Sequence, residues 1–159
     1  MTPSERDRGF TLDELLVVIA LLGVMMALAV GGWRSWSRAS QQSGTAQEVE
    51  STLRAAQQRA VTEGRSQCVM FDPAAGTWSV YRGACDESKV RVLGPFRTRS
   101  PDVHLTAPQF TSYAGVVSTG VTFRARGTAW AGKVQVTREG SPKAYTITVE
   151  RLTGRVEVG

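Results

Sequence analysis

The fold of this chain is decided at Gly9-Phe10-Thr11-Leu12-Asp13-Glu14, which runs directly into the apolar stretch Leu15–Val30. A polar segment ends in a glycine, and two carboxylates then stand at the start of the apolar run. The 21 residues from Phe10 to Val30 would form a helix of roughly 30 Å, at about 1.5 Å per residue, which matches a bilayer core. An acid at the mouth of such a helix is expensive in hydrocarbon unless a partner neutralises it. The stretch therefore predicts a membrane-length helix whose acid has a specific partner.

Two other interpretations of the apolar run are a removable secretory signal and a plain membrane anchor. A secretory signal has a positive amino-terminal region, a shorter apolar core and a small-residue cleavage site. Ala27-Leu28-Ala29 would offer such a site, but Glu5–Arg8 carries no net side-chain charge and the run is long. A plain anchor explains the hydropathy and leaves the glycine and Glu14 without a role.

The junction resembles the processing site of type IV prepilins and type II secretion pseudopilins. The resemblance rests on Gly-Phe-Thr-Leu, one further residue and Glu, followed by the apolar run. It implies that a prepilin peptidase cuts between Gly9 and Phe10 and methylates the new amino terminus. Glu14 is then the fifth residue after the cut, where these families place a glutamate. Asp13 departs from the pattern, since this position is usually apolar, although the helix amino terminus softens its cost.

The resemblance also supplies the expected topology. Arg6 and Arg8 before the apolar run are matched by Arg34 and Arg38 after it, so the arginines do not decide the orientation. Prepilin-like proteins keep the leader in the cytoplasm and the carboxyl-terminal domain outside. The expected location is therefore the inner membrane, crossed once, and afterwards a pilus or pseudopilus.

Beyond the apolar run, the pattern predicts that the helix continues between residues 45 and 63. Apolar residues recur there at spacings of three and four, on one face: Val49, Leu53, Ala56 and Ala60. Glu50 and Arg54 form a supporting pair on the solvent side. Gly31-Gly32 and Ser43-Gly44 are expected to act as a loose joint, and Gly64 as the stop.

From Ser66 onward, the pattern changes to the alternation of strands separated by turns. The expected strands are Gln67–Phe71, Thr77–Arg82, Val90–Leu93, Val103–Leu105, Val121–Arg126, Lys133–Arg138, Ala144–Glu150 and Arg155–Val158. Gly94–Pro101 is expected to separate two of them, and Ala107-Pro108 and Gly115 to mark a loop. The Val49/Leu53 helix face would cover the apolar side of these strands. The predicted fold class is α+β, type IV pilin-like, with a long amino-terminal helix packed on an antiparallel β-sheet domain.

The expected organisation has four parts. Residues 1–9 form the leader, 10–32 the transmembrane and assembly helix, 33–64 its amphipathic continuation, and 65–159 a β-rich globular domain. Removing the leader from the 159 residues leaves 150, enough for a membrane helix and one small domain.

The carboxyl-terminal third resembles the GspH/FimT pseudopilin domain. The resemblance rests on Gly120–Ala129, a strand led by Gly132, Tyr145–Val149 and Thr153–Val156. It implies a minor pilin or pseudopilin that lies near a filament tip. A major pilin is the alternative within the filament class. The implied partners are the prepilin peptidase, other pilins or pseudopilins, and the inner-membrane assembly platform. In the filament, Glu14 would neutralise the methylated amine of a neighbouring Phe10, since each charge alone is costly in an apolar bundle.

The two cysteines, Cys68 and Cys85, both lie in the part expected to be exported. An oxidising compartment favours a disulfide between them, closed around one predicted hairpin and stabilising by about 3 kcal/mol. Two independent buried thiols are the alternative. His104 is the only histidine and no Cys-x-x-Cys spacing exists, so neither a metal site nor a cofactor is expected.

The charge balance leaves nucleic-acid binding open. Residues 33–159 carry 17 Lys and Arg against 10 Asp and Glu. Some FimT-like proteins bind DNA through paired arginines in the last hairpin. Arg155 matches the first of these, but Glu157 occupies the second position, where it would repel phosphate. Six other cations could still form a basic face: Arg124, Arg126, Lys133, Arg138, Lys143 and Arg151. A solvated charged surface is the preferred interpretation, and DNA uptake is the alternative.

No motif of a catalytic site is recognisable in the sequence. The motifs G-x-S-x-G and H-E-x-x-H are absent. No acid or nucleophile lies at a sequence spacing from the one histidine that is recognisable as catalytic. The chain is therefore expected to be a substrate of the peptidase and not an enzyme.

Overall fold

The computed structural model describes residues 11–159, and among these every side chain except those of residues 30–32 and 34–35. Helix α1 (Leu12–Thr62) comes first and nine strands follow it within the described part. The chain divides into two compact units, one ending at Ala39 and the other spanning Ser40–Gly159, so that α1 contributes to both. Helix α1 runs through both predicted joint positions, Gly31-Gly32 and Ser43-Gly44.

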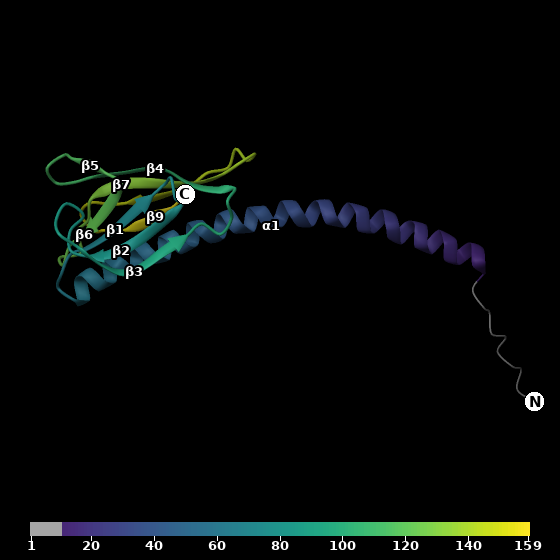
Figure 1. Ribbon diagram of the computed structural model, residues 1–159, viewed down its shortest axis with the longest axis horizontal. Helices are drawn as coiled ribbons and strands as arrows, with labels where there is room; N and C mark the ends of the chain where they lie inside the picture. The colour runs from purple at the N-terminus through teal and green to yellow at the C-terminus, as the bar shows by residue number, and fades with distance from the viewer. Residues whose placement is uncertain (1–10) are drawn as a thin grey trace, which may run out of the picture. The chain divides into compact units, whose positions relative to one another are not determined.

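In the second unit, α1 buries one face against the strands (Figure 1). The four residues predicted for this face, Val49, Leu53, Ala56 and Ala60, are each at most 1% exposed. The helix ends where Gly64 adopts φ 62°, with the N–H of Arg65 donating to the carbonyl of Ala60 at 3.2 Å and that of Gly64 to Val61 at 3.4 Å. This is a Schellman ending, in which glycine takes the left-handed position without a Cβ clash. The predicted face and stop are both confirmed.

The strands form two antiparallel sheets. The first has the order β3 (Val90–Arg97), β2 (Thr77–Arg82), β1 (Gln67–Asp72) and β6 (Gly120–Phe123). The second has the order β5 (Val117–Ser118), β4 (Val103–Thr111), β7 (Ala131–Arg138), β8 (Tyr145–Val149) and β9 (Val156–Val158). The α+β class with a helix on antiparallel strands is therefore confirmed.

One hydrophobic core joins the helix to both sheets. Leu53 of α1, Trp78 of the first sheet and Phe110 of the second are each at most 1% exposed and belong to the same cluster. Polar contacts fix the helix on the core, because a buried donor needs an acceptor. The side chain of Gln42 donates to the carbonyls of Val136 and Lys143, at 3.1 and 2.7 Å.

Two predicted interruptions were wrong, because the chain forms strands there, and both contain a proline. The strand predicted at Val121–Arg126 also ends earlier, at Phe123, and β5 was not predicted. The loop expected at Ala107-Pro108 is part of β4, where a bulge interrupts the register between Thr106 and Gln109. Ala107 takes φ 47° at this bulge. The third strand likewise continues through Gly94-Pro95 to Arg97, as an edge strand with irregular register. Bulges and edges are the places where a sheet tolerates a residue without an N–H.

Gly132 on β7 offers a sharp test of this bulge. A Cβ there would overlap the carbonyl oxygen of Gln109 and lie 2.6 Å from the Cα of Phe110. We expect Gly132→Ala to lower the free energy of unfolding by about 3 kcal/mol, the upper end of overpacking effects, because backbone atoms must move. Denaturant unfolding of the Ser40–Gly159 unit measures it. Thr148→Ala, at an exposed position of β8, is the control and is expected to stay within about 0.5 kcal/mol of wild type. Equal midpoints for the two variants would contradict the geometry.

Candidate assembly site and candidate nucleic-acid interface

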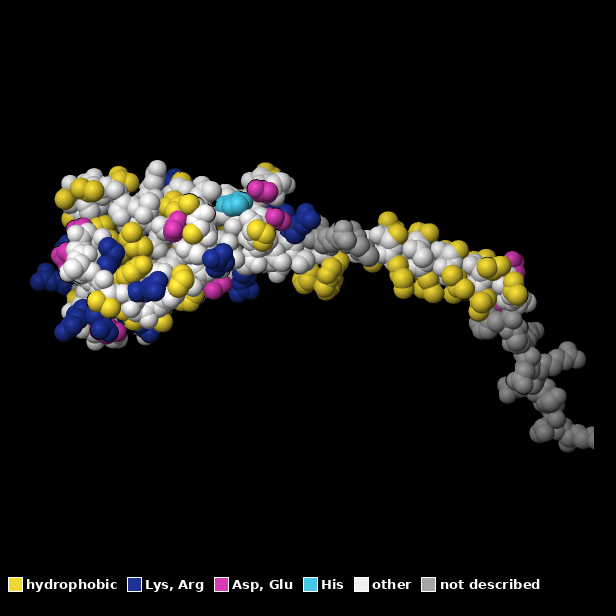
Figure 2. All heavy atoms as spheres, in the orientation of Figure 1, with side chains coloured by type: hydrophobic (Ala, Val, Ile, Leu, Met, Phe, Trp, Pro, Cys, Tyr) yellow, Lys and Arg dark blue, Asp and Glu magenta, His cyan; other side chains and the backbone are white. Residues whose placement is uncertain are grey.

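The apolar part of α1 exposes its side chains on every side. In the described residues, Leu12–Ala29 is the one stretch that is long and apolar enough to cross a membrane, and none of it is buried within the protein. Twelve large hydrophobic side chains between Leu12 and Leu28 are exposed, from 44% at Val18 to 78% at Leu12. Figure 2 shows them as a continuous hydrophobic surface along this segment. Burying each would contribute about 1.5–3 kcal/mol, so the segment is built to be covered by lipid or protein.

Glu14 lies in the first turn of α1, together with Asp13. The hydroxyl oxygen of Thr11 accepts a hydrogen bond from the N–H of Glu14 at 3.3 Å, so Thr11 is the N-cap. The sequence analysis missed this role, although Thr11-Leu12-Asp13-Glu14 matches the capping-box pattern. Two acids near the positive end of the helix are favourable. Gly9 and Phe10, the predicted processing site, lie outside the described residues.

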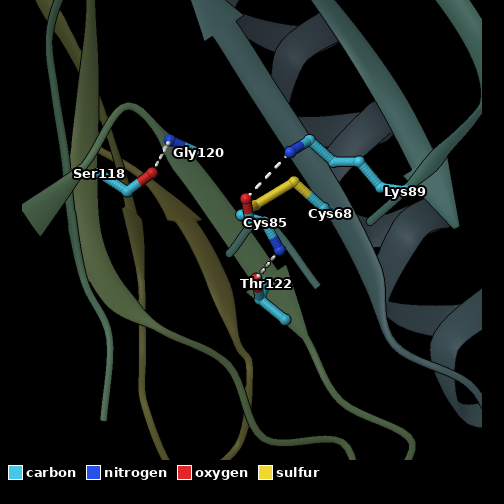
Figure 3. The surroundings of a disulfide bond; sticks show 6 residues. All are labelled: Cys68, Cys85, Lys89, Ser118, Gly120 and Thr122. Atoms are coloured by element: carbon cyan, nitrogen blue, oxygen red, sulfur yellow. Dashed lines mark hydrogen bonds between the residues drawn. A yellow bond between two sulfur atoms is a disulfide. The ribbon is translucent and has the colours of Figure 1, made fainter. Parts of the chain in front are cut away.

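Cys68 and Cys85 form a disulfide, as predicted, with an S–S distance of 2.08 Å and a Cα–Cα distance of 5.1 Å (Figure 3). It closes the β1–β2 hairpin near β6. The N–H of Cys85 donates to the hydroxyl of Thr122 on β6 at 2.9 Å, and the ammonium of Lys89 donates to the carbonyl of Cys85 at 3.0 Å (Figure 3). The bond therefore fastens the segment after β2 to the middle of the first sheet.

Arg155 and Glu157 are paired on the last hairpin. The guanidinium of Arg155 lies 2.6 Å from the carboxylate of Glu157, and both side chains are more than half exposed. Val156 between them is buried, so the two charges share one face. Across the same groove lies the predicted Glu50–Arg54 pair, at 2.5 Å. Arg155 is therefore partly neutralised, as its sequence spacing predicted.

A second basic cluster surrounds Tyr113. The guanidinium carbons of Arg124 and Arg151 lie 4.5 and 5.4 Å from the centre of its ring, distances typical of cation–π contacts. The Tyr113 hydroxyl donates to the carbonyl of Ala129 at 3.3 Å, which fixes the ring. Arg126 lines the adjoining groove. In the part of the chain that the structure describes, no carboxylate pairs with these three arginines.

The remaining predicted cations do not join this cluster into one face. Lys143 lies over the ring of Tyr145 at 4.6 Å, whereas Lys133 and Arg138 lie at opposite ends of β7. The groove beside Tyr113 also contains two acids, Asp86 and Glu87. Figure 2 shows Lys and Arg side chains gathered at the end of the globular unit where α1 ends, with acids among them. The structure thus brings Arg124, Arg126 and Arg151 together. Arg155 lies in a separate groove, where Glu157 partly neutralises its charge.

An exposed apolar helix that continues into a helix packed on antiparallel sheets, with one disulfide, defines the class of type IV pilin-like subunits. Residues 45–153 match the family model of the type II transport protein GspH, and residues 5–30 match that of the prokaryotic N-terminal methylation motif. The chain therefore belongs to the GspH family.

Similar structures and relatives agree with this assignment. The minor pseudopilin EpsH of the Vibrio cholerae type 2 secretion system has a TM-score of 0.57 at 11% identity, over 74% of this chain and 94% of that one. The type IV minor pilin FimU of Pseudomonas aeruginosa has a TM-score of 0.55 at 16% identity, over 78% and 92%. At these identities the likeness concerns the fold. A fimbrial protein of Pseudomonas aeruginosa is 34% identical over 59 residues, which span 37% of this chain and 38% of that protein.

Removal of the disulfide should destabilise the globular unit. The bond joins residues 17 apart, so loop-closure entropy predicts a loss of about 3 kcal/mol in the Cys68→Ser/Cys85→Ser variant. Denaturant unfolding of the Ser40–Gly159 unit would measure it. A reductant should lower the midpoint of the wild type and leave that of the double variant unchanged. Unchanged stability in the variant would contradict a fastening role for the bond.

Proposed function

We propose that this protein is a minor subunit of a type II secretion pseudopilus or type IV pilus, incorporated near the filament tip. A prepilin peptidase cuts between Gly9 and Phe10 and methylates Phe10. The observation that carries the proposal is the apolar helix Leu12–Ala29, none of which is buried; it lies within the match to the methylation motif and precedes a GspH domain. The role is structural: the chain is a substrate of the peptidase and a building block, and not a catalyst.

The apolar helix serves two environments in turn. In the inner membrane its exposed side chains face lipid, with the globular unit outside the cytoplasm. An assembly platform then extracts it, and the helices of neighbouring subunits cover the same surface. Both environments remove apolar area from water, and the transfer between them is possible because lipid and packed helices are similarly apolar.

Glu14 specifies the register of the packed helices. Its carboxylate neutralises the methylated amine of Phe10 on a neighbouring subunit. A buried pair is tolerable where a single buried charge is not, so only the register that pairs them is stable. The Thr11 cap supports this role, since its hydrogen bond with the N–H of Glu14 stabilises the first turn of α1, which carries the carboxylate.

A FimT-like, DNA-binding minor pilin is the second candidate, and a major pilin is the third. The second is supported by the unneutralised arginines around Tyr113, because a basic cluster with an aromatic ring is suited to nucleic acid. It is opposed by the Arg155–Glu157 pair and by Asp86 and Glu87 beside the cluster. A major pilin would dominate the protein sheared from cells, whereas a minor one would be scarce.

Replacement of Glu14 tests the proposed assembly contact. In cells, Glu14→Ala should lower the amount of the protein in sheared filaments at least about tenfold, because removing one partner of a buried pair costs about 3–5 kcal/mol. The neighbouring Asp13→Ala removes the same charge and should be incorporated like wild type. Mass spectrometry of the amino-terminal peptide, showing methylated Phe10 in each variant, controls for processing. Normal incorporation of Glu14→Ala would rule out the register role.

DNA binding by the purified Ser40–Gly159 unit separates the first two candidates. We expect no mobility shift of double-stranded DNA at about 150 mM salt. Glu157→Gln should strengthen binding at low salt, because it frees Arg155 and removes a charge that repels phosphate. A salt-dependent shift by the wild type that Arg124→Ala/Arg151→Ala abolishes would instead favour the second candidate.

A further inference from the structure

Trp33 and Trp36 form an exposed aromatic pair on α1, in the unit that ends at Ala39. Their ring centres lie 5.5 Å apart, and the two residues are 68% and 65% exposed. Three residues apart on a helix, they project from the same side. The other two tryptophans, Trp78 and Trp130, are 1% and 3% exposed in the core of the globular unit. The exposed pair therefore has no role in the core, and large exposed aromatic rings indicate contact with something else.

The position of the pair along the helix identifies what it contacts. Trp33 lies 19 positions after Glu14 along the helix, and Trp36 lies 22 positions after it. At about 1.5 Å per residue these distances are roughly 28 and 33 Å, on either side of the roughly 30 Å thickness of a bilayer core. When Glu14 lies at one face of the hydrocarbon, the tryptophan pair therefore lies at the other.

The chemistry of the surrounding sequence fits a lipid headgroup layer. Indole rings prefer the membrane–water interface, where the ring contacts acyl chains and the N–H reaches water or headgroup oxygens. No acidic residue occurs from Leu15 to Gln47, and the two charges in that range are Arg34 and Arg38. Positive charge at this point of the sequence favours anionic lipid headgroups.

We propose that Trp33 and Trp36 anchor the helix in the headgroup layer of the outer leaflet, preferring anionic phospholipids, and thereby set its depth in the membrane. The proposal rests on the membrane-anchored state of the proposed function. At this depth, Glu14 stays at the opposite headgroup layer and enters an apolar environment only when the helix joins a filament. The pair thus holds an unassembled subunit with its carboxylate solvated.

Tryptophan fluorescence of the full chain in vesicles tests the depth of the pair. The vesicles contain phosphatidylethanolamine and phosphatidylglycerol, with bromine on either the shallow or the deep part of the acyl chains. The signal of the pair is the difference between wild type and Trp33→Phe/Trp36→Phe, since Trp78 and Trp130 are buried in both. We expect shallow bromines to quench this difference signal more strongly than deep bromines or aqueous iodide. Replacing phosphatidylglycerol by phosphatidylcholine should shift the quenching toward iodide.

A second measurement reports the depth of the opposite end without relying on tryptophan. A water-soluble maleimide should label Leu12→Cys, two positions before Glu14, and should not label Ile19→Cys in the middle of the span. Trp33→Leu/Trp36→Leu should reduce this contrast, because the helix loses the anchor that fixes its depth.

Two results would overturn the proposal while leaving the proposed function intact. In the first, the protein is bound to vesicles but the fluorescence of the tryptophan pair is quenched mainly by iodide. In the second, it is quenched mainly by deep bromines. The first result together with loss of filament incorporation in Trp33→Leu/Trp36→Leu would assign the pair to a contact between subunits instead. A chain that does not float with the vesicles would contradict the membrane-anchored state itself, and so the proposed function.

Discussion

The exposed apolar surface of Leu12–Ala29 is the constraint on which the rest of this protein depends. Twelve large hydrophobic side chains on one short helix cannot remain in water, and within the described residues nothing covers them. At about 1.5–3 kcal/mol for each fully buried side chain, the total exceeds the stability of a typical domain. Such a segment must be in a membrane or among other helices. The residues at its two ends carry the contacts that we have proposed for it.

Charges and aromatic rings are confined to the ends of this segment. Asp13 and Glu14 lie in the first turn, where the N-cap Thr11 and the helix dipole stabilise them. Trp33 and Trp36 lie beyond the other end. Between them the surface is uniformly apolar, so lipid tails and neighbouring helices are equally acceptable covers. Specificity therefore has to come from the ends, where we have proposed a charge pair for Glu14 and a headgroup contact for the two tryptophans.

In the globular unit, the second half of α1 is held on the two sheets by a shared core and by a few specific bonds. Leu53 and its neighbours on one face of α1 complete a core that neither sheet could close alone. The Cys68–Cys85 bond fastens the segment after β2, and the side chain of Gln42 fixes the start of the packed helix on β7. The charged surface that remains is divided: Arg155 is neutralised by Glu157, while Arg124 and Arg151 are ordered by Tyr113.

The apolar helix, its buried continuation at Val49 and Leu53, the fold class and the family could all be predicted from the amino-acid sequence, because they rest on local periodicity and on a short motif. The sequence also predicted the disulfide and the opposition of Arg155 by Glu157, since both depend on residues close in the chain. The passage of β4 through Ala107-Pro108 was decided only by the tertiary structure. Alanine followed by proline favours a turn in local sequence rules. The strand can bulge there because Gly132, 24 positions after Pro108, has no Cβ and lets the backbone of Gln109 and Phe110 come close. The Tyr113 cluster likewise joins three segments that no sequence spacing relates, and so it appears only once the sheets are folded.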